Sequence, residues 1–141
     1  MAGKPRVVLD SNILISAFVY GGKPEQILRL ILEKQIDGFT SSPLLSELFE
    51  VLIKKFHFSL EKIQVFEQKI KKNFLVVYPE KTVHVVKDED DNKVLEVAVE
   101  GGCDFIITGD KELLRLGKWK GISILTADQF LGRLDEFQRG T

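Results

Sequence analysis

The sequence has few of the features that would assign the chain to a disulfide-bonded, secreted or membrane protein. Cys103 is the single cysteine among 141 residues, which excludes an intramolecular disulfide and favours a reducing compartment. No apolar run approaches the roughly 20 residues of a membrane-spanning helix. No apolar core of signal-peptide type follows residues 1–6. We therefore expect a cytoplasmic protein with no membrane partner.

The chain also lacks an excess of positive charge and a set of soft metal ligands. Its formal net charge is −1, so no overall basic field attracts nucleic acid. A nucleic-acid role would have to depend on local patches or on a bound cation. The two histidines, His57 and His84, stand apart from each other and from the lone cysteine, so nothing indicates a zinc site.

The residues that are present indicate one globular domain over residues 1–141, with 44% hydrophobic and 29% charged content. Short apolar runs alternate with helical patterns, which predicts a parallel sheet with helices on both faces. The expected strands cover residues 6–10, 38–41, 74–78, 104–108 and 122–125. Asp91 is expected to cap a helix over residues 92–100, and Asp128 to cap the last helix.

Three carboxylates stand where such a sheet would bring side chains together. Asp10 ends the first strand, Asp110 follows the fourth, and Asp91 opens the helix that leads into the fourth strand. Ligands of open parallel sheets bind at the carboxyl edge of the strands. If the first and fourth strands are neighbours, Asp10 and Asp110 share that edge.

Glu47 is a fourth candidate, because it lies beside Leu44 and Val51 on the wheel of the helix after the second strand. Carboxylates gathered in a small pocket repel one another, and a divalent cation removes that conflict. Oxygen ligands alone suit Mg²⁺ or Mn²⁺. Such an ion would also let an acidic protein approach a polyanion.

Structural readings of the same residues stay open at this point. Asp10 and Asp91 are also ordinary helix caps, Asp110 is also a turn residue after Gly109, and Glu47 could face solvent. Residues 88–90 are expected to form a solvated loop, with an outer contact to the site from Asp88 as the alternative.

Four segments of the chain resemble the PIN domain family, and within it the toxin components related to VapC. They are "VVLDSNILISAF" (7–18), "SELFEVL" (46–52), "DEDDNKVLEVAVEGGCDFIITGDKELL" (88–114) and "ISILTADQFL" (122–131). The resemblance covers nearly the whole chain, and the order and spacing of the acidic motifs make it specific.

The resemblance implies a three-layer α/β fold with a five-stranded parallel sheet in the order 3-2-1-4-5, flanked by helices on both faces. It implies a ribonuclease that depends on one or two Mg²⁺ or Mn²⁺ ions and hydrolyses RNA phosphodiesters by in-line attack of water. By position, the acidic set is Asp10, Glu47, Asp91 and Asp110, with Asn12 and Thr108 as supporting polar residues. A homodimer or higher homo-oligomer and an inhibitory antitoxin protein are the implied partners.

Among the basic residues, Lys111 and Arg115 flank the expected site in sequence and are the candidate contacts to substrate phosphates. Two other functions compete with a nuclease. One is an inactive PIN-like module that binds RNA or protein. The other is a phosphatase of haloacid-dehalogenase type, which would need an Asp where this chain has Asn12.

Overall fold

The computed structural model describes residues 3–139, and the side chains of residues 3–136. The two ends of the expected 1–141 domain lie outside the described residues. The helices are α1 (Ser11–Val19), α2 (Gly22–Leu32), α3 (Ser42–Lys54), α4 (Leu60–Asn73), α5 (Glu89–Glu100), α6 (Lys111–Leu116) and α7 (Ala127–Arg139). The strands are β1 (Arg6–Leu9), β2 (Asp37–Thr40), β3 (Leu75–Val76), β4 (Phe105–Ile107), β5 (Lys118–Trp119) and β6 (Ile122–Leu125).

The strands form one sheet in the order β3-β2-β1-β4-β6-β5. The first five strands in this order are parallel to one another, which confirms the predicted order 3-2-1-4-5. The prediction missed β5, an antiparallel edge strand that pairs with β6. Two residues next to a Gly-rich turn carry no periodic pattern by which to recognise a strand.

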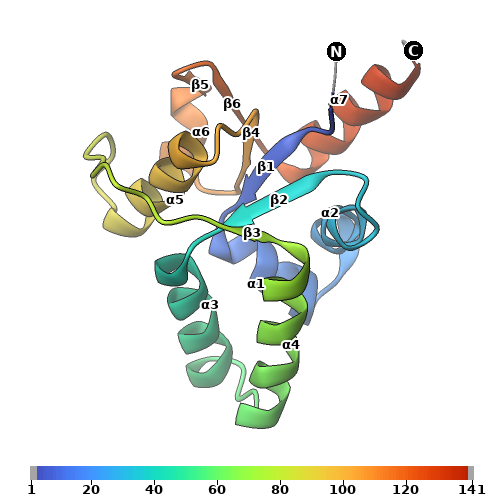
Figure 1. Ribbon diagram of the computed structural model, residues 1–141, viewed down its shortest axis with the longest axis vertical. Coiled ribbons are helices and arrows are strands. Elements are labelled where there is room, and N and C mark those ends of the chain that lie inside the picture. Colours follow the sequence, from blue (N-terminus) through green and yellow to red (C-terminus); the bar gives the residue numbers. More distant parts are fainter. Residues whose placement is uncertain (1–2, 140–141) are drawn as a thin grey trace.

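Helices cover both faces of this sheet, as predicted for a three-layer fold. In Figure 1, α5 and α6 lie on one side of β1, and α2 and α7 lie on the other. Along β1, Val7 and Leu9 pack into the core beneath α1, α2, α3, α4 and α7, whereas Val8 packs into the core beneath α5 and α6. Because β1 is buried on both faces, it reads as a continuous apolar run in the sequence.

The predicted start of α5 was wrong by three residues. The helix begins at Glu89, and Asp88 is its N-cap, accepting hydrogen bonds from the backbone N–H groups of Asp90 (2.8 Å) and Asp91 (3.4 Å). Asp91 therefore lies in the first turn and is not the cap. Four consecutive acidic residues offered several equivalent caps, and the local sequence could not distinguish among them.

The predicted cap of the last helix was also wrong. Thr126 caps α7, since its hydroxyl accepts from the N–H of Gln129 (3.1 Å) and the Gln129 side chain accepts from the N–H of Thr126 (3.0 Å). This reciprocal pair is a capping box. Asp128 instead forms an exposed ion pair with Lys23 of α2. Within residues 3–139, no helix is long and apolar enough to cross a bilayer.

Candidate active site

The neighbouring carboxyl ends of β1 and β4 bring Asp10 and Thr108 together. Leu9 pairs with Ile107 across the two strands, and the N–H of Asp10 donates to the Ile107 carbonyl (3.0 Å). One residue further along each strand, the Thr108 hydroxyl donates to Oδ2 of Asp10 (2.7 Å). Asp10 is 5% exposed and Thr108 is fully buried. The predicted meeting of the two strand ends is thus observed.

Asp110 is held next to this pair by the same hydroxyl. Its backbone N–H donates to Oγ1 of Thr108 (3.0 Å), and its Oδ2 accepts from the N–H of Leu113 (2.9 Å). The Asp110 side chain is therefore the N-cap of α6. Asp110 is thus a helix cap rather than only a turn residue, and its carboxyl also contacts that of Asp91.

Asp91 projects from the first turn of α5 and is 7% exposed. Its Oδ2 is buried without a hydrogen-bond partner among the described residues. Because Asp88 provides the cap, the Asp91 side chain is free to face the strand ends. The pKa of Asp91 is raised from 3.8 to about 8. Burial is the largest cause, and contact with the Asp110 carboxyl and the charges of Asp110 and Asp10 contribute as well.

Glu47 approaches the same region from α3, which packs against both α1 and α5. It is half-buried, and its Oε2 has no hydrogen-bond partner among the described residues. Burial raises the pKa of Glu47 from 4.5 to about 7, and the charges of Asp90 and Asp10 add to the effect. The helical-wheel argument for an inward-facing Glu47 is thus supported over a fully solvated side chain.

Burial also raises the pKa of Asp10, against the opposing effects of the Thr108 hydroxyl and the N–H of Asn12, and the Asp110 charge raises it further. The four carboxyls come from four different parts of the chain, and the charges of neighbouring acidic residues disfavour the ionised forms of Asp10, Glu47 and Asp91. This is the electrostatic conflict that the sequence predicts for the acidic set.

A hard divalent cation fits the chemistry of this set, since all its donors are oxygens and two buried carboxylate oxygens have no partner. However, no three acidic, histidine or cysteine side chains within residues 3–139 already lie close enough together to hold an ion. Asp10 is turned toward Thr108, and Asp110 toward the start of α6. Coordination by three or more carboxylates therefore requires side-chain rotation.

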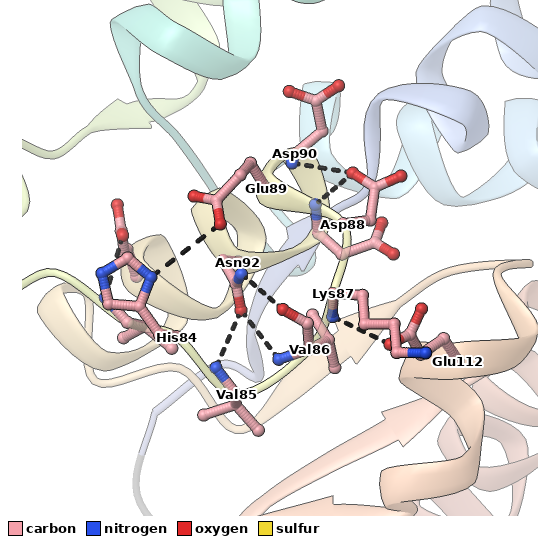
Figure 2. Close-up of polar contacts among 12 residues, drawn as sticks. His84, Val85, Val86, Lys87, Asp88, Glu89, Asp90, Asn92 and Glu112 are labelled. Carbon is pink, nitrogen blue, oxygen red and sulfur yellow. Dashed lines mark hydrogen bonds and ion pairs between the residues drawn. The ribbon is translucent and has the colours of Figure 1, made fainter.

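Asn92 is a buried polar residue of this region whose part the sequence did not indicate. Its Oδ1 accepts from the N–H groups of Val85 and Val86 (both 3.1 Å), and its Nδ2 donates to the Val86 carbonyl (2.8 Å). Figure 2 shows these bonds from α5 to the segment that leads into Asp88, where Glu112 of α6 accepts from the N–H of Lys87 (2.9 Å). Asn92 thus fixes the path of the chain just before the cap of α5.

Glu96 and Glu100 repeat this contact along the same side of α5. They accept from the N–H groups of Val83 (3.0 Å) and Glu80 (3.1 Å) respectively. Asn92, Glu96 and Glu100 are spaced four residues apart, so they form one stripe on the helix. We call residues 80–87, held by this stripe, the strap. Polar residues at this spacing were the only signal in the sequence, and they are equally typical of a solvated helix face.

The remaining predicted residues lie at the margin of the site. Asn12 is exposed on the first turn of α1, beside Asp10. Lys111 and Arg115 are exposed on α6, directly after Asp110. Ser11 is buried and its hydroxyl lacks a partner among the described residues.

Residues 6–112 match the family model described as a PIN domain. The match covers well over half of the chain, so the chain belongs to the PIN domain family, whose members are generally nucleases. The predicted family and the α/β fold class are both confirmed.

Two kinds of relative accompany this match. An uncharacterized protein of Methanocaldococcus jannaschii, MJ1680, is 38% identical over 122 residues, which span 80% of this chain and 76% of that protein. VapBC2 from Rickettsia felis, solved with a DNA fragment from its promoter, has a TM-score of 0.59 at 14% identity, over 84% of this chain and 96% of that one. The PIN domain of T. brucei RRP44 has a TM-score of 0.58 at 14% identity, over 97% of this chain and 84% of that one. At such identities the two solved structures show a shared fold.

Proposed function

We propose that this chain is a metal-dependent endoribonuclease that hydrolyses RNA phosphodiester bonds, and that it is the toxin of a toxin–antitoxin pair. The observation that carries the proposal is the burial of carboxyls at one sheet edge, where Oδ2 of Asp91 and Oε2 of Glu47 have no partner among the described residues. These two unpartnered oxygens have no structural use in the fold, because a buried carboxylate oxygen without a partner costs stability.

In the proposed site, Asp10, Asp91 and Asp110 hold one or two Mg²⁺ or Mn²⁺ ions, and Glu47 contributes directly or through water. A bound divalent ion supplies positive charge for the phosphoryl oxygens and favours attack by water. Thr108 orients Asp10 through its 2.7 Å hydrogen bond and positions the backbone of Asp110. Asn12, exposed beside Asp10, is the proposed polar contact to the substrate at the site's mouth.

The proposal is tested by digesting RNA with the purified chain in Mg²⁺, in Mn²⁺ and with a chelator. Loss of an outer partner of a metal ligand typically lowers activity by 10–100-fold, so Asp10→Asn is expected to lower cleavage by at least about a hundredfold. Asp128→Asn is the matched control, because it removes the same charge from an exposed ion pair of α2 and α7. Equal activity of Asp10→Asn and wild type, or cleavage that survives the chelator, would contradict the proposal.

The competing functions give other results in the same assay. An inactive PIN-like module binds RNA or protein but shows no cleavage that depends on metal. A phosphatase of haloacid-dehalogenase type forms a covalent aspartyl phosphate, which a nuclease does not. The complete acidic set argues against the first of these, and the exposed Asn12 in place of a second aspartate argues against the other.

An antitoxin partner is proposed from the likeness in fold to VapBC2, and a homodimer or higher homo-oligomer from the family resemblance. On α2, the apolar side chains Ile27, Leu28 and Ile31 are buried in the core and are not available for self-association. On α4, Leu60 and Val65 remain 70% and 59% exposed. We propose that the protein self-associates through this face of α4. We also propose that residues 1–141 form a single domain and that the protein is cytoplasmic.

A further inference from the structure

A groove of about 490 Å³ opens directly beside Glu47, between α3 and the first turns of α5. One wall is a single stripe of α3 that runs from Pro43 through Glu47 and Val51 to Lys55, and the other wall is formed by Asp90 and Lys93. The groove therefore shares Glu47 with the acidic set and reaches the carboxyl end of α3 at Lys55.

Two of the three lysine ammonium groups that line this groove are paired with carboxylates. Glu50 pairs with Lys54 (2.7 Å), and Asp90 pairs with Lys93 (3.1 Å). Lys55 lines the groove as well, and neither a hydrogen bond nor an ion pair of its ammonium group is found among the described side chains. The far end of the groove thus presents a free cation to an incoming anion.

The length of the groove suits a short stretch of sugar–phosphate backbone. Glu47, Val51 and Lys55 are four residues apart on one helix, so about 12 Å of helix axis separates Glu47 from Lys55. This is room for a few nucleotides. Val51 and Pro43 supply apolar surface between the charged groups. Three carboxylates and three ammonium groups line the groove, and with Glu50–Lys54 and Asp90–Lys93 paired, Lys55 is the lining ammonium group left to contact a phosphate.

We propose that this groove binds the backbone of single-stranded RNA next to the cleaved bond, with Lys55 contacting a phosphate. The inference rests on the proposed ribonuclease function and names the substrate path for it. It differs from the sequence-based expectation, in which Lys111 and Arg115 were the phosphate contacts, because neither of those residues lines the groove.

The test compares Lys55→Gln with Lys72→Gln, a matched change of an exposed lysine on α4, using a short single-stranded RNA. Loss of a charged hydrogen bond to phosphate is expected to raise KM about tenfold or more with kcat unchanged. The slope of log affinity against log salt should fall by about 0.7 for one lost contact to a single strand. Lys72→Gln should change neither quantity, and an RNA duplex should compete poorly.

The outcomes separate this inference from the proposed function. If the wild type cleaves RNA with metal, but Lys55→Gln keeps the KM and salt slope of Lys72→Gln, the groove assignment is wrong and the nuclease proposal stands. A rise in KM for Lys111→Gln but not for Lys55→Gln would place the substrate over α6 instead. If the wild type does not cleave RNA at all, the nuclease proposal fails. Equal RNA affinity of Lys55→Gln and wild type, by fluorescence anisotropy, would then overturn the groove assignment too.

Discussion

Thr108 joins two of the proposed catalytic carboxylates through a single buried hydroxyl. The hydroxyl donates to Oδ2 of Asp10 and accepts from the backbone N–H of Asp110, at 2.7 Å and 3.0 Å. Two separate motifs of the sequence therefore depend on one oxygen atom. The hydrogen bond to Asp10 also opposes the effect of burial, which raises the pKa of that carboxyl.

Replacing this hydroxyl by a methyl group should harm both stability and activity. Thr108→Val leaves the buried Asp10 oxygen and the Asp110 N–H without their partner, so we expect a loss of about 1–3 kcal/mol in the free energy of unfolding. Cleavage should fall about 10–100-fold, as for other outer partners of metal ligands. Urea denaturation and RNA digestion measure the two effects.

Thr82→Val is the control for this change, because Thr82 lies exposed in the strap. Surface substitutions of this kind are usually neutral within about 0.5 kcal/mol. If Thr108→Val were as stable and as active as Thr82→Val, the hydroxyl would not be what positions the two aspartates.

At the scale of the element, α5 combines three tasks on different faces. Val94, Leu95, Val97 and Ala98 pack into the core, the stripe of Asn92, Glu96 and Glu100 holds the strap, and Asp91 points to the site. In Figure 2 the Asn92 carboxamide lies between the helix and the backbone of Val85 and Val86. Because the strap leads into the cap residue Asp88, its path bears on where α5 begins.

We expect Asn92→Ala to loosen the strap without unfolding the chain. The substitution removes the acceptor of two N–H groups and the donor to the Val86 carbonyl. Losing these bonds should lower the free energy of opening the strap by at least about 1.4 kcal/mol, which is a tenfold change in the opening equilibrium. Exchange of the Val85 and Val86 amides should therefore rise at least tenfold. Hydrogen exchange resolved by residue measures this.

Asn73→Ala serves as the comparison, since the Asn73 amide bonds to Lys69 and Lys34, away from the strap. It should leave exchange at Val85 and Val86 unchanged. Unaltered protection of these two amides in Asn92→Ala would mean that the strap is held by its other contacts.

The α-helical and strand patterns could be read from the sequence because each element buries a regular set of apolar residues. The run Val7, Val8, Leu9 predicted a strand buried on both faces, which the two cores confirm. The cap of α5 and the strand β5 could not be read. Their positions depend on which of several equivalent polar residues, or which two-residue segment, finds a partner in the folded chain.

At the scale of the whole molecule, the acidic site opposes folding when no metal is bound. Folding raises the pKa of Asp91 from 3.8 to about 8 and that of Glu47 from 4.5 to about 7, and it raises the pKa of Asp10 as well. A group whose pKa is raised by folding contributes stability below its unfolded pKa, and this contribution is lost as the pH rises through the folded pKa.

Without metal, the thermal midpoint should therefore fall as the pH rises from about 4 to about 8 because of these groups. Asp91→Asn removes the carboxyl whose pKa rises from 3.8 to about 8, so it should be more stable than wild type above about pH 8, by a margin that shrinks toward about pH 4. Added Mg²⁺ should stabilise the wild type most at high pH, because it binds the ionised carboxylates of the folded state.

Calorimetry of wild type, Asp91→Asn and Asp128→Asn in chelator and in Mg²⁺ checks this expectation. Asp128 is an exposed control in an ion pair far along the chain from the site. A midpoint for Asp91→Asn that follows the wild type at every pH would show that Asp91 is not under electrostatic strain.

The sequence by itself determined the alternation of helices with the five parallel strands, the family and the four candidate carboxylates. These follow from hydrophobic periodicity and from motifs, which are local properties of the chain. Only the tertiary structure decided that Asp91 is free of a capping role, that Asn92 holds the strap and that Lys55 shares a groove with Glu47. Each of these depends on which groups lose water and meet a partner from a distant segment, and such encounters are fixed only when the chain packs.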